Sequence, residues 1–398
     1  MSSLVPEGWQ TLSLSEGIDI LSGYPFASSL FTNDSSKTGL IRIRDLVNQN
    51  IETYFDGAFD DNYLIRKGDV LIGMDGDFNI VKWNSAPSLL NQRICKVTVA
   101  GKIFDLAYLY QDLQKDLLEI NNQTGSTTVK HLSVKDIRGI HKSYPPLPEQ
   151  KKIASILTSV DEVIENTQKQ IDKLQDLKKA TMNELLTKGI GHTEFKDSEL
   201  GRIPNSWEVR AISEVVSIPN GQVDPKLEPY ASMPHIGSGN IISWTGQVKG
   251  VQTAFEAGQI SGKYLFSKNH ILYSKVRPNL AKVCMPQFDG ICSADVYPLI
   301  PKQKVSGKFV FQYLLTEKFT QVATEVSERT GMPKINRQDL NVLKLPMPPF
   351  EEQSEIARKI EAIDKATSLK SIKLHQTQSL KKSLMQDLLT GRVRVTVN

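Results

Sequence analysis

Cysteine is scarce in this sequence. The chain has 398 residues and three cysteines, Cys95, Cys284 and Cys292, which show no CxxC spacing. An odd count without such spacing implies neither a zinc site nor a disulfide framework. A reduced cytoplasm is the location that fits best.

Long apolar runs and the common catalytic motifs are also missing. No stretch approaches the ~18 apolar residues that a membrane-spanning helix needs, and the start MSSLVPEGWQ lacks the basic and apolar regions of a signal peptide. The sequence contains no phosphate-binding loop, GxGxxG, GxSxG or HExxH motif, and its six histidines have no metal-ligand spacing. We therefore expect a protein that is neither secreted nor embedded, and the residues show no sign of a catalytic, metal or cofactor site of the chain's own.

Two short stretches resemble parts of catalytic motifs. MPPF at 347–350 ends like the motif with which adenine methyltransferases hold a flipped base, but Met347 stands where Asn or Asp would hold the amine. EFK at 194–196 matches the end of a metal-dependent nuclease motif, but it lies in a polar, glycine-flanked linker. We favour structural roles for both.

One phrase occurs twice. PPLPEQKKIASIL begins at Pro145 and PPFEEQSEIARKI begins at Pro348, 203 residues later. The register continues without a gap to LLT at 185–187 and LLT at 388–390. VPEGW, which ends at Trp9, is likewise echoed by IPNSW, which ends at Trp207. A chain of this length exceeds one ordinary core, so the repeat predicts two units, each a variable body followed by a nearly constant tail.

Both tails are predicted to be long helices. Prolines stand just before each tail and Gly189 and Gly391 just after, as is typical of helix ends. Apolar residues recur at heptad spacing, which indicates a helix that packs along another helix. The predicted seam and partner-binding residues are Ile153, Leu157, Val160, Ile164, Ile171, Leu174, Ile356, Ile360, Ile363, Leu374, Leu384 and Leu388.

Two interpretations of these helices remain open. They pack only on each other as a structural spine, or they also present a mixed interface to another protein. Thr367 and Lys370 interrupt the second seam with polar side chains and favour the mixed interface. A two-fold relation between the halves would lay the helices antiparallel.

The bodies combine short strands with one amphipathic helix each. Apolar and β-branched runs such as DVLIG and HILYSKV are punctuated by Gly, Pro and Asn, and helices are expected at 104–120 and 307–326. We predict an α+β fold, with two mixed α/β bodies joined by two long antiparallel helices in a pseudo-two-fold repeat.

Polar and cationic loops in the two bodies suit DNA recognition. Arg and Lys pair with guanine acceptors or phosphate, Asn with adenine, and Asp with the cytosine amine. A net charge of +4 permits a polyanionic partner. The counterpart loops differ in chemistry, which suits two bodies that read different sequences. The candidate DNA-binding residues are Asp75, Asn79, Lys82, Asn91, Arg93, Thr127, Lys130, Lys275, Arg277, Asn279, Lys282, Arg329, Lys334, Asn336 and Arg337.

The sequence resembles the specificity subunits of type I restriction-modification systems. The resemblance covers almost the whole chain and is strongest in YPPLPEQKKIASIL, MPPFEEQSEIARKI, ELLTKGI and DLLTGRV. It implies target recognition domains at 1–145 and 191–345, and conserved spacer helices at 146–190 and 346–398. Each domain would read one half of a bipartite, asymmetric double-stranded DNA site, and the helices would set the gap.

The resemblance also implies partners. Two modification subunits, which hold S-adenosylmethionine and methylate adenine at N6, would dock on the helices, and restriction subunits that use ATP and Mg would join them. Two other classes stay open from the residues alone. One is a free-standing enzyme on DNA; the other is an adaptor whose bodies read nothing, which a sequence-specific footprint would exclude.

Overall fold

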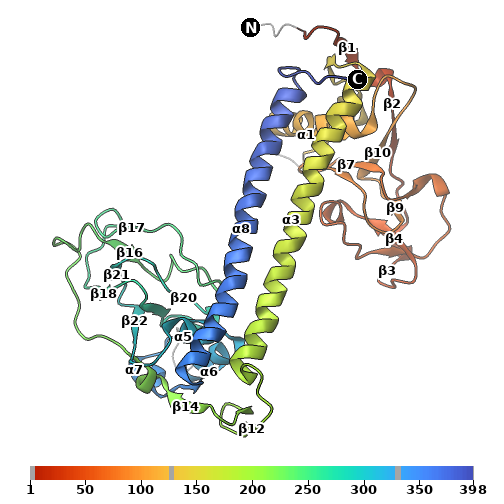
Figure 1. Ribbon diagram of the computed structural model, residues 1–398. Helices are drawn as coiled ribbons and strands as arrows, with labels where there is room; N and C mark the ends of the chain where they lie inside the picture. The colour runs from red at the N-terminus through yellow and green to blue at the C-terminus, as the bar shows by residue number, and fades with distance from the viewer. Residues whose placement is uncertain (1–4, 125–129, 328–332, 398) are drawn as a thin grey trace. The chain divides into compact units, whose positions relative to one another are not determined.

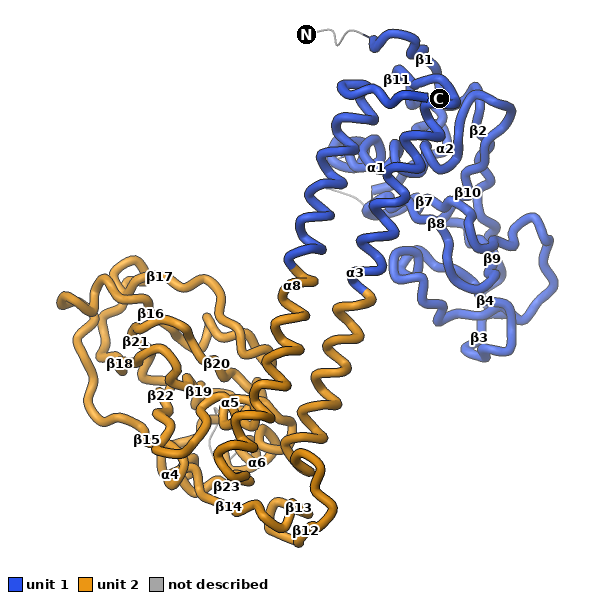
Figure 2. Tube along the Cα trace, viewed as in Figure 1, with its two compact units in different colours: residues 1–168, 372–398 blue, residues 169–371 orange. Residues whose placement is uncertain are grey.

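The computed structural model describes residues 5–124, 130–327 and 333–397, and it divides into two compact units. Unit 1 comprises residues 1–168 and 372–398, and unit 2 comprises residues 169–371 (Figure 2). Each unit therefore contains one body, the beginning of the helix that follows this body, and the end of the other long helix. The α+β content and the internal repeat predicted from the sequence are confirmed.

Unit 1 contains a four-stranded antiparallel sheet, a five-stranded sheet and a two-stranded ribbon (Figure 1). The four-stranded sheet has the order β2-β10-β7-β8, the five-stranded sheet has the order β3-β5-β4-β9-β6 with β4 and β9 parallel, and β1 pairs with β11. Its strands are β1 Gln10–Ser13, β2 Ile18–Ser22, β3 Phe31–Thr32, β4 Thr38–Ile41, β5 Tyr54–Phe55, β6 Leu64–Ile65, β7 Val70–Gly73, β8 Ile80–Lys82, β9 Ser88–Leu90, β10 Ile94–Val99 and β11 His141–Tyr144.

Unit 2 repeats this arrangement. The sheet β15-β22-β19-β20 corresponds to β2-β10-β7-β8, the parallel pair β16 and β21 corresponds to β4 and β9, and β14 pairs with β23 as β1 does with β11. Its strands are β12 Phe195–Lys196, β13 Ile203–Pro204, β14 Glu208–Ala211, β15 Val216–Ser217, β16 Pro234–Ile236, β17 Gln252–Thr253, β18 Tyr264–Phe266, β19 Ile271–Ser274, β20 Val283–Cys284, β21 Gly290–Cys292, β22 Val296–Pro301 and β23 Lys344–Met347.

The expected body helices form, with one difference. The first is a single helix, and a short helix follows it later in the body. In unit 2 the expected helix at 307–326 is two helices, because Thr316 begins a new one: its hydroxyl accepts from the Phe319 amide at 3.3 Å. The body helices are α1 Leu106–Gln123, α2 Val134–Arg138, α4 Ile212–Val215, α5 Gly307–Leu314, α6 Glu317–Ser327 and α7 Arg337–Val342.

The two tails are the long helices α3 Leu147–Lys188 and α8 Phe350–Leu388. Within each unit the segments of α3 and α8 run antiparallel. An ion pair joins the two segments in each unit, and the two ion pairs are equivalent in the repeat. Lys381 contacts Asp161 at 2.7 Å in unit 1, and Lys178 contacts Asp364 at 2.7 Å in unit 2. All predicted seam residues are buried or half-buried, and Leu388 joins Ile153 in the core of unit 1.

In each unit the glycine that follows a long helix lies close to a tryptophan ring. Gly189 and Gly391 have a φ of +69°, the left-handed conformation that glycine adopts without strain after a helix. A Cβ at Gly189 would lie 2.8 Å from the ring of Trp207, and one at Gly391 would lie 3.0 Å from the ring of Trp9. This close approach accounts for the repeated glycine after each tail and the repeated tryptophan before each body.

Candidate nucleic-acid interface

Three loops meet at the ends of the main sheet in unit 1. We call residues 74–79, 91–93 and 130–132 the unit 1 junction. The first loop joins β7 to β8, the second precedes β10, and the third leads to α2. Backbone hydrogen bonds hold them together, from Met74 to Arg93 at 2.9 Å, from Gly76 to Lys130 at 3.1 Å and from Leu132 to Met74 at 2.7 Å. Segments far apart in the sequence thus present side chains in one place.

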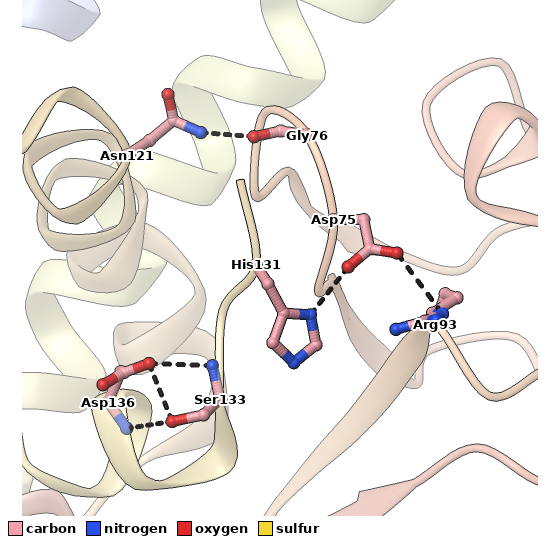
Figure 3. A network of polar contacts seen from close by, with 7 residues as sticks. All are labelled: Asp75, Gly76, Arg93, Asn121, His131, Ser133 and Asp136. Atoms are coloured by element: carbon pink, nitrogen blue, oxygen red, sulfur yellow. Dashed lines mark hydrogen bonds and ion pairs between the residues drawn. The ribbon is translucent and has the colours of Figure 1, made fainter. Parts of the chain in front are cut away.

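Asp75 lies at the centre of the unit 1 junction (Figure 3). One carboxylate oxygen is 2.7 Å from His131 Nδ1, and the other is 3.4 Å from Arg93 Nε. The side chains of Arg93 and His131 are each more than half exposed, whereas that of Asp75 is 22% exposed. The carboxylate is therefore fixed by its neighbours while both basic groups remain accessible to a ligand.

The remaining candidates in unit 1 have separate surroundings. Asn79 and Lys82 are exposed. Asn91 accepts from the Gln92 amide at 2.9 Å, and Lys130 Nζ donates to the side-chain and backbone oxygens of Asn121. Asn121 in turn donates to the Gly76 carbonyl at 2.5 Å. Lys130 therefore helps to hold Asn121 against the loop between β7 and β8. Thr127 lies outside the described residues.

Unit 2 builds an equivalent junction from residues 275–282, 293–295 and 333–336. Its backbone amides connect the same three segments, from Lys275 to Asp295 at 3.0 Å, from Arg277 to Pro333 at 2.9 Å and from Ile335 to Lys275 at 2.9 Å. The isolated bridge between Val276 and Lys334 matches the bridge between Asp75 and His131 in unit 1. The two junctions therefore share a backbone design.

Asp295 is the central carboxylate of the unit 2 junction. Its Oδ1 lies 2.8 Å from Lys334 Nζ and 3.5 Å from Lys275 Nζ. The two lysines hold the pKa of the Asp295 carboxyl below its usual range, and the hydrogen bond from Lys334 is the largest cause of this lowering. Lys275 Nζ also lies 5.2 Å from the centre of the Tyr297 ring, a cation–π distance.

Three other candidates in unit 2 make structural contacts. Lys282 donates to the Ser238 carbonyl at 2.7 Å, and Arg337 donates to the Pro219 carbonyl at 2.9 Å. Asn336 caps α7 by accepting from the Asp339 amide at 2.9 Å. These interactions occupy polar atoms that the sequence suggested for DNA.

Arg277 and Asn279 lie at the exposed tip of the unit 2 hairpin. Arg277 has a φ of +51°, a left-handed conformation that is unusual for a residue other than glycine. The hydrogen bond from its backbone amide to the Pro333 carbonyl holds the residue in this conformation. The last candidate, Arg329, lies outside the described residues.

Sequence reasoning missed two members of these junctions, His131 and Asp295. His131 follows the candidate Lys130, and it was interpreted as one of six scattered histidines. Asp295 directly precedes β22, as Arg93 directly precedes β10. Aligning the two halves around these strands would have singled out Asp295, because the repeat pairs it with a candidate of opposite charge.

The three cysteines are buried, and the described side chains do not gather into a cluster of metal-ligating groups. Burial raises the pKa of the Cys95 and Cys284 thiols to about 12, so neither forms the thiolate that a nucleophile requires. Within the described ranges, no group of three or more His, Cys, Asp or Glu side chains could hold a metal ion. Met347 ends β23, where it is buried in the core of unit 2.

Comparison with known proteins identifies the class. The family model for the type I restriction modification DNA specificity domain matches twice, at residues 6–176 and 204–378. The chain belongs to this family. The specificity domains occur in tandem, as the internal repeat predicted, and DNA recognition is the role that the family description gives.

Curated relatives agree with this membership, and a solved structure shares the fold. The type I restriction enzyme EcoDI specificity subunit of Escherichia coli is 28% identical and covers 90% of this chain and 82% of its own length. The MjaVIII specificity subunit of Methanocaldococcus jannaschii is 28% identical over 98% of this chain and 94% of its own. The S subunit of a type I restriction-modification system from M. genitalium shares the fold with a TM-score of 0.66, at 14% identity, over 98% of this chain and 97% of its own.

Within the described residues, none of the helices of this specificity protein is both long enough and apolar enough to cross a membrane.

Proposed function

We propose that this chain is the non-catalytic reader of a bipartite, asymmetric DNA site in a type I restriction-modification complex. Residues 1–145 and 191–345 act as the two target recognition domains, and each uses its junction to read one half-site. The candidates with the most accessible side chains, such as Arg93, Arg277 and Lys334, contact the DNA. The protein works in the cytoplasm, where the DNA is.

One observation carries this proposal: the same backbone junction occurs in both units with different side chains. Asp75, Arg93 and His131 occupy the first junction, whereas Lys275, Asp295 and Lys334 occupy the second. Bases are distinguished by the arrangement of donors and acceptors in the major groove. Two junctions with a common frame and different donors and acceptors suit two different half-sites.

The long helices set the gap and dock partners in this proposal. A helix of 42 residues is about 63 Å long at ~1.5 Å per residue, a little under two turns of B-DNA at ~34 Å per turn. Exposed apolar side chains on both helices give a partner surface to bury: Val163, Ile372 and Leu380 in unit 1 and Leu177 and Leu369 in unit 2.

The partners supply the chemistry. Two modification subunits dock on the helices, bind S-adenosylmethionine and methylate adenine at N6. Restriction subunits with ATP and Mg add cleavage. The reader itself forms and breaks no covalent bond.

Co-expression of the chain with its modification subunit tests the proposal. Host DNA is then sequenced for N6-methyladenine. We expect a single bipartite motif with an unread gap, methylated once on each strand. A complex that assembles but methylates no motif, or methylates a single undivided sequence, would contradict it.

A further inference from the structure

Each junction pairs one carboxylate with two basic side chains. In unit 1, Asp75 contacts Arg93 and His131. In unit 2, Asp295 contacts Lys275 and Lys334. The paired groups are partly exposed, with 46% of the side chain accessible for both Asp295 and Lys334. Exposed ion pairs contribute little to stability, so stability does not explain why both units keep one at this place.

The carboxylate changes position between the two junctions. The carboxylate of unit 1 lies on the loop after β7, and Arg93 directly precedes β10. In unit 2 a lysine lies on the equivalent loop after β19, and Asp295 directly precedes β22. In backbone register Val276 corresponds to Asp75 and Asp295 corresponds to Arg93, so the pairing is retained although the carboxylate has moved to another segment. This change of position indicates that the neutralised cluster itself is used, rather than a particular residue at a particular position.

The backbone and one aromatic ring restrict the basic groups further. Lys275 is only 16% exposed, is stacked over Tyr297, and donates its amide to the Asp295 carbonyl. A lysine ammonium has three donors and an arginine guanidinium has five, so each can hold a carboxylate and still donate to a base.

We infer that Asp75 and Asp295 are specificity-determining residues, which orient the basic side chains of their junctions toward base edges and weaken their attraction for phosphate. This inference rests on the proposed function, because it assigns a role within DNA reading. Phosphate contacts carry no sequence information, whereas base contacts do. A basic group neutralised by a fixed carboxylate loses long-range attraction for any duplex but keeps its directed hydrogen bonds. Each carboxylate therefore favours discrimination over affinity.

The test uses the complex of the full chain with its modification subunit, with Asp295→Asn and Asp75→Asn as reciprocal variants. Affinity is measured by titration over a range of salt concentrations, for the methylated motif's own sequence and for duplexes with one half-site scrambled. With Asp295→Asn, affinity for a duplex that lacks the unit 2 half-site should rise at least about threefold at low salt. The dependence of log affinity on log salt should steepen by about 1 for each added phosphate contact.

Methylation mapping gives an independent readout. Asp295→Asn should relax one half of the methylated motif and leave the other half unchanged, and Asp75→Asn should relax only that other half. Asp295→Glu keeps the carboxylate and should keep the discrimination, which separates loss of charge from disturbed folding.

Several results would overturn the inference. If Asp295→Asn leaves both affinity and motif unchanged, or relaxes both halves equally, the carboxylate does not determine specificity. If it weakens the matching duplex without strengthening the scrambled one, Asp295 reads a base directly. A wild-type complex without any bipartite motif would overturn the proposed function itself, which distinguishes the two failures.

Discussion

Gln150 and Gln353 give a physical reason for the repeated proline-glutamine phrase. Gln150 is buried; its Oε1 accepts from the Asp105 amide at 2.8 Å and its Nε2 donates to the Pro145 carbonyl at 2.9 Å. Gln353 makes the same contacts with the Ser306 amide at 2.8 Å and the Pro348 carbonyl at 2.8 Å. Asp105 and Ser306 are the N-caps of α1 and α5. One side chain thus fastens α3 to the N-terminus of α1, and its counterpart fastens α8 to the N-terminus of α5.

Gln353→Ala should destabilise the protein by about 2 to 4 kcal/mol, because it leaves a partly buried amide and a buried carbonyl without partners. The shift in the unfolding midpoint in urea measures this effect. Gln378→Ala, at an exposed position of the same helix, is the matched control and should change little. Equal stability of the two variants would contradict the fastening role.

Asp112 is a buried acidic residue of unit 1 that has no acidic counterpart in unit 2. It is 2% exposed and contacts Lys142 at 2.8 Å, and burial is the largest influence that raises the pKa of its carboxyl to about 6. The equivalent position in unit 2, seven residues after the N-cap of α5, is Tyr313. Because the native carboxyl binds its proton more tightly than the unfolded one, ionisation costs stability as the pH rises from about 4 to about 6.

Asp112→Asn removes this titration, while Lys142 keeps its contact with Asp116. The free energy of unfolding of the wild type, minus that of the variant, should therefore fall across this range by up to about 1.4 kcal/mol per pH unit. Urea unfolding at pH 4, 5, 6 and 7 measures the difference. A difference that stays constant or rises with pH would refute the raised pKa.

At the scale of elements, local signals were enough for the long helices. Prolines before 147 and 350, and glycines at 189 and 391, allowed both helices to be predicted to within a few residues. The break between α5 and α6 could not be predicted, since a threonine inside an apolar pattern carries no clear stop signal. The junctions could not be predicted either. His131 and Asp295 acquire their partners only when segments tens of residues apart pair. The hydrogen bonds of Lys130 to Asn121 and of Arg337 to Pro219 likewise depend on the fold.

Lengthening both long helices should lengthen the gap of the recognised site. Seven residues inserted after Gln168 in α3 and after Ser371 in α8 preserve the heptad phase and add about 10 Å. We expect unchanged half-sites and a gap longer by about three base pairs, at ~3.4 Å per base pair. Methylation mapping of the co-expressed complex reads both quantities. Insertion of seven residues in α3 alone serves as the unmatched control, and an unchanged gap in the double insertion would refute the spacer role.

At the scale of the whole molecule, the chain is one design used twice. Both units pair the strand after the tryptophan with the strand before the long helix, and both complete their core with a segment of each long helix. In each unit one ion pair also joins the segments of the two long helices: Lys381 contacts Asp161 in unit 1, and Lys178 contacts Asp364 in unit 2. The common parts hold the frame, and the variable parts lie in the junctions. Recognition should therefore be transferable with a body.

The most direct test of that claim is the methylation motif of a chain that carries the second body twice. Residues 1–145 are replaced by a second copy of residues 191–345, and the chimera is co-expressed with the modification subunit beside the intact chain. The account predicts that the intact chain methylates an asymmetric bipartite motif, and that the chimera methylates a motif with the same half-site at both ends. If the chimera assembles with its partner but keeps the original asymmetric motif, or methylates no bipartite motif, the bodies do not read the half-sites and the account is wrong.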